Sequence, residues 1–307
     1  MLRAPFPYFG SKSAIASKVW EALGQPAHYL EPFFGSGAVL LARPAYDASK
    51  HVETVCDADG LLCNVWRALQ LAPDEVARWC DWPVNHADLQ ARRKRMMEAK
   101  MQLLEQLVSS DEYFDARLAG YWIWTASCWI GDGVAQPGEQ MPHVSDSGHG
   151  VHALLRRDAI NQWFAQLSAR LRCVRVVCGD WSRVCGGNWQ TNCGTCGIFF
   201  DPPYGAKAKR CARIYDVDSD TVADDVRNWC RKRAGNKKLR IVLAGYVEEH
   251  EELLAEDWTM HQWTAHGGYS HLGHGRGRSN RKREALFFSP HCLSDRPLLV
   301  LIERNTT

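Results

Sequence analysis

The chain has 307 residues, of which 46% are hydrophobic, and its formal net charge is +2. This composition suits one large or two modest domains and excludes a wholly disordered chain. The near-neutral charge excludes a surface that is positive throughout, although it leaves room for a local basic face. The N-terminus lacks the apolar run of a secretory signal, and no stretch reaches the roughly 18 apolar residues of a membrane span. We therefore expect a cytoplasmic protein without membrane contact, whose 12 cysteines are reduced thiols.

The first 72 residues alternate helical and strand-like segments. The sequence predicts helices over 11–23, from Ala38 and over 61–71, and strands over 28–32 and 51–59. This order is typical of a parallel sheet covered by helices.

The pattern changes over residues 73–150. The part up to residue 128 is predicted to be helical throughout, and residues 131–150 form a polar loop rich in Gly, Pro, His and Ser. A basic cluster, Arg92 to Arg95, fits either the solvated face of a helix or a contact with phosphate groups. We interpret 73–150 as an inserted helical domain.

The α/β alternation returns after residue 150. The sequence predicts helices over 151–171 and 222–233, strands over 173–180, 197–205 and 239–246, then a loop over 267–283 and a last apolar strand over 284–290. The predicted catalytic domain therefore consists of residues 1–72 and 151–307.

The most specific motif is Asp201-Pro202-Pro203-Tyr204, which follows the apolar run Ile198 to Phe200. We expect it at the carboxyl end of a strand, where ligands bind in open α/β sheets. A carboxylate and a rigid backbone carbonyl can hold the two hydrogens of an exocyclic adenine amine, which turns its lone pair toward a methyl donor. An aromatic ring can stack on a base extruded from the duplex. The alternative is an ordinary proline turn, and the position after an apolar strand argues against it.

A second motif, Glu31-Pro32-Phe33-Phe34-Gly35-Ser36-Gly37, lies between a predicted strand and a predicted helix. Its glycines allow the backbone to approach a ligand closely. Asp57 ends the next predicted strand 22 positions after Gly35, about the spacing at which an acid reaches a ribose hydroxyl. The absence of a full GxGxxG favours an adenosyl ligand over a dinucleotide, and the absence of a Walker motif argues against ATP hydrolysis.

These two motifs follow Pro7-Tyr8-Phe9-Gly10-Ser11-Lys12, and the three together resemble the Dam-type, alpha-group DNA adenine-N6 methyltransferases of bacteria and phages. Ser11 stands where that family usually has a second glycine, and Ile130 where it usually has asparagine. The resemblance extends to Asp57-Ala58-Asp59 with Asn64, to Tyr121 to Gly131, to Gly179-Asp180 and to Glu284 to Pro290. It implies a Rossmann-like methyltransferase core with an inserted helical target-recognition domain.

The resemblance also implies roles for individual residues. S-adenosylmethionine would be the cofactor, with Asp57 at its ribose and Asp180 at its adenine. The other cofactor-binding residues would be Tyr8, Lys12, Glu31, Pro32, Phe33, Gly35 and Gly37. Asp201, Pro202, Pro203 and Tyr204 would take the target adenine from double-stranded DNA in a bacterial or phage-infected cell. No obligate protein partner is implied, and a restriction-modification system, a phage genome and an orphan regulator all fit.

Two further groups of residues allow more than one interpretation. Arg276, Arg278, Arg281, Lys282 and Arg283 lie among Gly, Ser and Asn, so this loop either follows DNA phosphates or is simply solvated. Cys185, Cys193 and Cys196 include one Cys-x-x-Cys pair, but no second pair follows at the spacing of a zinc site. We therefore favour reduced thiols and expect no metal.

Other activities use related chemistry. N4-cytosine methylation acts on the same kind of amine, but related enzymes usually begin the motif with serine, so Asp201 favours adenine. Methylation of RNA or of a protein glutamine is a further alternative, against which the insert and the basic loop argue. A catalytically silent DNA-binding module would keep the basic loop and lose the cofactor motifs, which this chain retains.

Overall fold

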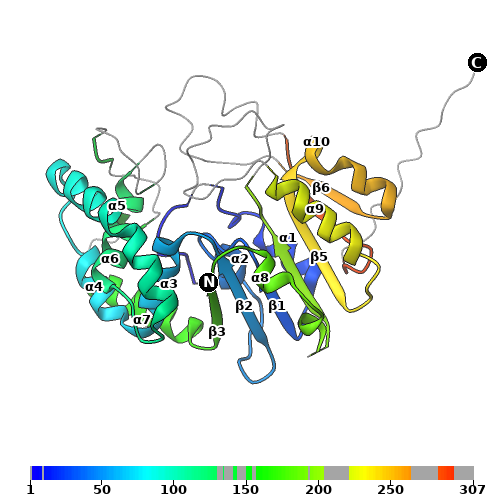
Figure 1. The fold of residues 1–307 in the computed structure, drawn as a ribbon, viewed down its shortest axis with the longest axis horizontal. Coiled ribbons are helices and arrows are strands. Elements are labelled where there is room, and N and C mark those ends of the chain that lie inside the picture. Colours follow the sequence, from blue (N-terminus) through cyan, green and yellow to red (C-terminus); the bar gives the residue numbers. More distant parts are fainter. Residues whose placement is uncertain are drawn as a thin grey trace, which may run out of the picture.

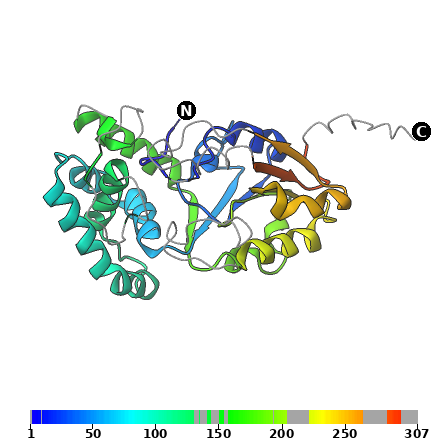
Figure 2. The ribbon, with the colours of Figure 1, turned by 90° about the horizontal axis from the view of Figure 1, so that it is seen from above.

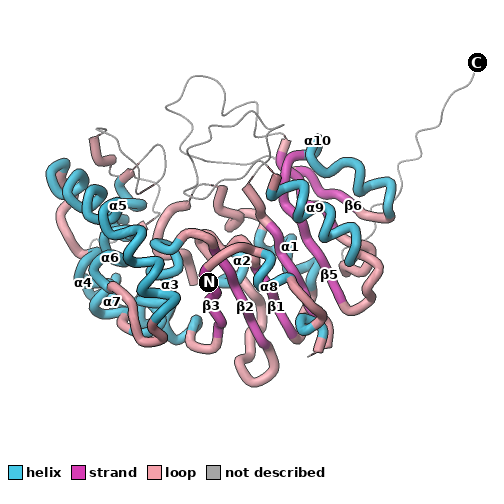
Figure 3. Tube along the Cα trace, viewed as in Figure 1, coloured by secondary structure: helices cyan, strands magenta, loops and turns pink. Residues whose placement is uncertain are grey.

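The computed structural model describes residues 2–8, 10–129, 134, 141–143, 150–153, 157–192, 194–203, 221–263 and 283–293. Within these ranges the chain has a mixed α/β fold, in which a seven-stranded, mostly parallel sheet is flanked by helices (Figures 1 and 3). No helix in this part of the chain has the length and apolar character needed to cross a membrane.

The sheet is doubly wound around its first strand. Its strands are β1 (His28–Glu31), β2 (Val52–Asp57), β3 (Val174–Cys178), β4 (Cys196–Phe200), β5 (Leu239–Tyr246), β6 (Thr259–Gln262) and β7 (Glu284–Phe288). They lie in the order β3-β2-β1-β4-β5-β7-β6. The first five strands are parallel, whereas β7 runs antiparallel to both β5 and β6. The chain winds outward from β1 to β3 and returns to β4 on the other side of β1, which makes the gap between β1 and β4 a topological switch point.

Helices cover both faces of the sheet. The first face packs against α1 (Ala16–Leu23), α2 (Ala38–Leu41), α3 (Gly60–Leu71) and α7 (Arg157–Leu171). The second face packs against α8 (Ser182–Cys185) and α9 (Val222–Arg233). Neighbouring β4 residues divide between the faces, with Phe199 in the first cluster and Phe200 in the second. All five residues of β4 are buried, as expected of an apolar run in a sheet covered on both sides.

The segment interpreted as an insert continues this core. Its helices α4 (Pro73–Cys80), α5 (His86–Ser109) and α6 (Ala116–Cys128) gather with α3 and α7 beyond the β3 edge of the sheet (Figures 1 and 2). Their buried residues Val76, Leu103 and Trp122 belong to the same hydrophobic cluster as the first face of the sheet. Asn64 of α3 exchanges two hydrogen bonds with the backbone of Asp115, each of 2.8 Å. The boundary at residue 73 therefore stays a prediction.

Half of the basic cluster is buried, although a solvated helix face and a contact with phosphate groups would both require exposed side chains. Arg92 and Arg93 are only 5% and 2% exposed. The guanidinium of Arg92 lies 4.2 Å from the ring centroid of Trp124, and that of Arg93 lies 3.5 Å from the ring centroid of Trp129. Burial lowers the pKa of Arg92. These two side chains hold α5 against α6 and the residue after it by packing on tryptophan rings. Only Lys94 and Arg95 of the cluster remain exposed.

Several element boundaries differ from the prediction. α1 begins at Ala16 rather than at residue 11, and the helical stretch after residue 73 is interrupted before α5 and before α6. Asn85 and Asp115 cap those two helices by accepting hydrogen bonds from backbone N–H groups of the first turn. The helix predicted over 151–171 begins with a short 3₁₀ turn, Val151–Ala153. The structure adds α8, α10 (Val247–His250), β6 and the 3₁₀ turns Trp189–Thr191 and Glu251–Glu256, which were not predicted.

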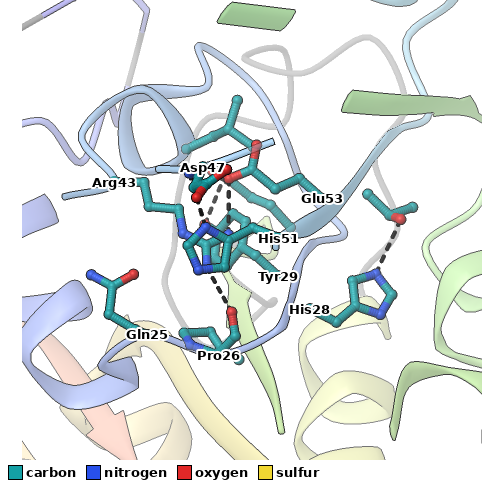
Figure 4. Close-up of polar contacts among 12 residues, drawn as sticks. Gln25, Pro26, His28, Tyr29, Arg43, Asp47, His51 and Glu53 are labelled. Carbon is teal, nitrogen blue, oxygen red and sulfur yellow. Dashed lines mark hydrogen bonds and ion pairs between the residues drawn. The ribbon is translucent and has the colours of Figure 1, made fainter. Parts of the chain in front are cut away.

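A buried ion-pair network lies near the amino ends of β1 and β2. Arg43 binds Glu53 with an Nη1–Oε1 distance of 3.1 Å and donates to the carbonyl of Pro26 at 2.6 Å (Figure 4). Arg170 of α7 binds the same carboxylate at 2.7 and 2.9 Å. The network ties α2, β2 and α7 together.

Candidate functional site

The two predicted motifs meet at one edge of the sheet. The glycine loop, residues 32–37, begins where β1 ends at Glu31, and Asp201 follows directly after the end of β4 at Phe200. β1 and β4 are neighbours, with Leu30 paired to Ile198. Both segments therefore leave the carboxyl ends of the strands that flank the switch point, which is where ligands bind in open α/β sheets.

The shape of the glycine loop depends on two glycines. Gly35 and Gly37 have φ angles of +49° and +64°, in the left-handed region that favours glycine. A Cβ atom on Gly35 would lie 2.8 Å from Cε1 of Tyr8, and one on Gly37 would lie 2.7 Å from Cζ of Phe34. The loop is thus turned tightly and covered by an aromatic ring, and a larger residue at either position would distort it.

The N-terminal segment lies against this loop. In addition to the contact of Tyr8 with Gly35, the hydroxyl oxygens of Ser11 and Ser36 are 3.3 Å apart. Ser11 therefore contributes a contact between the N-terminal segment and the glycine loop. The ring of Phe6 lies 4.6 Å from that of Trp122, measured between centroids, so helix α6 adjoins the same segment.

Lys12 pairs with Asp201. Its Nζ atom lies 2.9 Å from Oδ2 of Asp201, and the two side chains are 6% and 22% exposed. The same ammonium group donates to the carbonyl of Gly10 at 2.8 Å. Burial raises the pKa of the Asp201 carboxyl, and the charge and hydrogen bond of Lys12 oppose that rise. Lys12 was predicted to hold a cofactor, and that role stays a prediction; the structure places its ammonium group against the predicted catalytic carboxylate.

Glu31 provides a second carboxyl at this edge. It is only 2% exposed, and its Oε2 accepts a hydrogen bond of 2.9 Å from the hydroxyl of Tyr29. Burial raises the pKa of Glu31 well above its ordinary value, and the nearby charge of Asp201 raises it further. Two carboxyl groups with raised pKa values and one buried lysine therefore lie together at the switch point, an arrangement that is common at functional sites.

Asp57 holds the glycine loop to the end of β2. Its Oδ2 accepts the backbone N–H of Gly35 at 2.9 Å, and its Oδ1 accepts the N–H of Asp59 at 3.0 Å. Burial raises the pKa of Asp57, and these backbone hydrogen bonds oppose the rise. Because each carboxylate oxygen has two lone pairs, Asp57 can accept a ligand hydroxyl without releasing the loop.

Asp180 lies beyond the end of β3, next along the same edge. It is exposed, and its Oδ1 accepts the backbone N–H of Ser182 at 2.9 Å and the hydroxyl of the same serine. The next residue, Trp181, stacks with Phe33 of the glycine loop at 6.3 Å between centroids and 29° between planes. Sequence reasoning missed Trp181, although an aromatic residue directly after an acid at a strand end could have indicated it.

Part of the predicted site lies outside the described residues. This applies to Tyr204, Arg276, Arg278, Arg281 and Lys282, and also to Phe9, Ile130 and Cys193. Arg283 is described; it forms an ion pair with Glu248, and its guanidinium lies 4.4 Å from the ring centroid of Tyr246. Cys185 and Cys196 are buried, and within the described ranges no cluster of three or more His, Cys, Asp or Glu side chains could hold a metal ion.

Comparison with known proteins assigns no family to the chain. A scan of the sequence against known protein families found no match, and a search of curated proteins found no matching sequence. The residues at the carboxyl edge of the sheet are therefore the evidence for a function: a glycine loop, three acids at successive strand ends, an aromatic pair and a lysine bound to a fourth acid.

Proposed function

We propose that the protein is an S-adenosylmethionine-dependent DNA methyltransferase that modifies N6 of adenine in double-stranded DNA. The observation that carries the proposal is the meeting of the glycine loop and Asp201, from distant parts of the sequence, across one switch point. A cofactor loop and a base-binding acid must be neighbours for a methyl group to pass between their ligands.

The donor set along β1, β2 and β3 fits an adenosyl cofactor. Asp57 offers carboxylate lone pairs at the distance along the edge where nucleotide-binding folds hold a ribose. The tight glycine loop allows a methionine chain to approach the backbone, and Phe33 with Trp181 provides an aromatic surface beside Asp180. The bound cofactor would supply an electrophilic methyl group. What this chain contributes is the orientation of that group toward the end of β4.

Asp201 would act on the amine. An exocyclic adenine amine is a poor nucleophile, because its lone pair is delocalised into the ring. A carboxylate that accepts one N6 hydrogen, with a rigid backbone carbonyl of the proline turn accepting the other, favours a pyramidal nitrogen. The positive charge of Lys12 favours the charged form of Asp201, which accepts hydrogen bonds, and so opposes the effect of burial. Stabilisation of this kind by fixed charges is typically the largest contribution to catalysis.

The substrate assignment depends on sequence features that lie largely outside the described residues. Tyr204 would stack on the extruded adenine, and the basic residues from Arg276 to Arg283 would contact phosphates. Residues 73–150 would select the target sequence. Because α6 contacts Phe6 of the segment that covers the glycine loop, this selecting region would adjoin the cofactor site directly.

Two measurements on the purified full-length chain test the proposal. Calorimetry should show binding of S-adenosylmethionine, and incubation of duplex DNA with the methyl-labelled cofactor should yield N6-methyladenine when nucleosides are resolved by mass spectrometry. A product of N4-methylcytosine would overturn the adenine assignment. Cofactor binding without any methylated nucleoside in DNA or RNA, and without any methylated residue in protein, would instead identify a silent module.

A further inference from the structure

Two cysteines lie side by side behind the carboxyl edge of the sheet. Cys63 is on α3, and Cys178 is the last residue of β3, paired in register with Asp57 at the end of β2. Val174 and Val176 pack into the cluster that contains α3. Because side chains alternate along a strand, Cys178 points to the same face. Cys56, the nearest other thiol in β2, packs into the cluster on the opposite face of the sheet.

The sulfur of Cys63 is close to Cys178 and to the predicted cofactor site. It lies 3.3 Å from the carbonyl oxygen of Asp57 and 4.0 Å from the carbonyl oxygen of the residue that precedes Cys178. The two thiols are close enough for each to shift the pKa of the other. The carbonyl of Asp57 accepts a second hydrogen bond, of 2.8 Å, from the N–H of Gly179. The thiol pair and the backbone that positions Asp57 and Asp180 thus form one connected group.

The two thiols differ in chemical character. Cys63 is 3% exposed, and its hydrogen bond to Cys178 and its burial raise its pKa well above the ordinary value. Cys178 is partly exposed, and the hydrogen bond from Cys63 lowers its pKa. A partly exposed thiol with a lowered pKa next to a buried thiol is the arrangement of an oxidisable cysteine with its resolving partner.

We propose that Cys63 and Cys178 form a reversible disulfide that weakens cofactor binding at the adjoining edge of the sheet. The oxidant is a peroxide. The Cys178 thiolate attacks one peroxide oxygen, the O–O bond breaks, and the departing hydroxide takes a proton to become water, which leaves Cys178 as a sulfenic acid. The sulfur of Cys63 then attacks that of Cys178, so the S–S bond forms, the S–O bond breaks, and the hydroxyl leaves with the Cys63 proton as water.

The disulfide acts on the site through Asp57. It removes the S–H group beside the Asp57 carbonyl, and it draws the end of β3, with Gly179 and Asp180, toward α3. Loss of the sulfur contact with the Asp57 carbonyl and a shift of the Gly179 hydrogen bond should raise the dissociation constant of S-adenosylmethionine about tenfold. This consequence rests on the proposed function, whereas formation of the disulfide does not.

The test treats the full-length protein with hydrogen peroxide, blocks the remaining thiols and maps the linked peptides by mass spectrometry. Digestion with trypsin yields a peptide of residues 176–183 that contains Cys178. It also yields a peptide of residues 51–67 that contains both Cys56 and Cys63. A second cleavage before aspartate separates the latter two at Asp57 and Asp59. We expect a link between Cys63 and Cys178 that dithiothreitol reverses and that Cys178→Ser abolishes. Cys173→Ser, which removes an exposed thiol close by in the sequence, is the matched control and should leave the link intact.

Calorimetry with S-adenosylmethionine on the reduced and oxidised protein completes the test. Oxidation should weaken binding in the wild type and in Cys173→Ser, and have no such effect in Cys63→Ser or Cys178→Ser. A link to Cys56 instead, or no link, overturns the inference. A Cys63–Cys178 link that leaves the affinity unchanged overturns the control of binding. If the reduced wild type does not bind the cofactor, the proposed function fails, and the peptide map still decides whether the disulfide forms.

Discussion

Neutralising Glu53 should destabilise the fold more than most single substitutions. Its carboxylate is fully buried between two guanidinium groups, at 3.1 Å from Arg43 and at 2.7 and 2.9 Å from Arg170. Glu53→Gln keeps the size of the side chain but leaves two buried positive charges without a counterion. Charge-assisted hydrogen bonds contribute about 1.5–3 kcal/mol each, and removing one partner of a buried ion pair costs about 3–5 kcal/mol. We therefore expect the free energy of unfolding to fall by about 3–5 kcal/mol.

Urea unfolding followed by tryptophan fluorescence measures this change. Glu21→Gln is the matched control, because Glu21 is 60% exposed and pairs with Lys18 at 3.0 Å on the surface of α1. Exposed pairs contribute about 0.2–1 kcal/mol, so the control should change the unfolding free energy by no more than that. The m-value should stay constant in both variants. A loss in Glu53→Gln no larger than that of the control would refute the view that the buried network stabilises the fold.

Three further predictions follow from the structure. Neither ring nitrogen of His250 has a hydrogen-bond partner among the described residues, and burial lowers the pKa of His250 to about 3. Its neutral form therefore stabilises the fold above pH 6.5, and about 2 kcal/mol of that stability should be lost by pH 5 in urea titrations, but not in His250→Gln. Lys12→Met removes the charge that opposes the raised pKa of Asp201, so the acid limb of the methyl-transfer pH profile should move to higher pH; an unmoved limb would separate Lys12 from the chemistry. Gly35→Ala strains a residue at φ +49° beside Tyr8, and should weaken S-adenosylmethionine about tenfold or more. Gly235→Ala, where no atom lies within 4 Å of the added Cβ, should not.

Apolar patterning predicted the central elements well. β5 and α9 have the predicted bounds, and β1, β2, β3 and β4 lie within the predicted strands or one residue from them. β4 and β5 are largely apolar runs and α9 is an amphipathic helix, so local sequence defines them. β6 was missed because its four residues, Thr259 to Gln262, include only one apolar side chain and are half-buried or exposed. Its place in the sheet depends on pairing with β7 at the edge.

Contacts between distant segments account for the remaining differences. In the sequence alone, the charge run from Arg92 indicates a solvated helix. In the fold, Trp124 of α6 and Trp129 directly after α6 lie over this run, and no local pattern contains that information. The same holds for Lys12, whose partner Asp201 lies far along the chain and becomes a neighbour only when β4 pairs with β1. Sequence motifs thus identified which residues gather at the switch point, and the fold was needed to show which of them touch.

Single-turnover methyl transfer by Asp201→Ala tests the central claim most directly. The variant and the wild type would be preloaded with duplex DNA and labelled S-adenosylmethionine, with both affinities measured separately and Asp225→Ala, which removes an exposed acid on α9, as the control. If Asp201 acts on the amine, the variant should bind both ligands with nearly unchanged affinity and transfer methyl groups at least about a hundredfold more slowly, whereas the control should match the wild type. Transfer by Asp201→Ala at close to the wild-type rate would contradict the proposed active site.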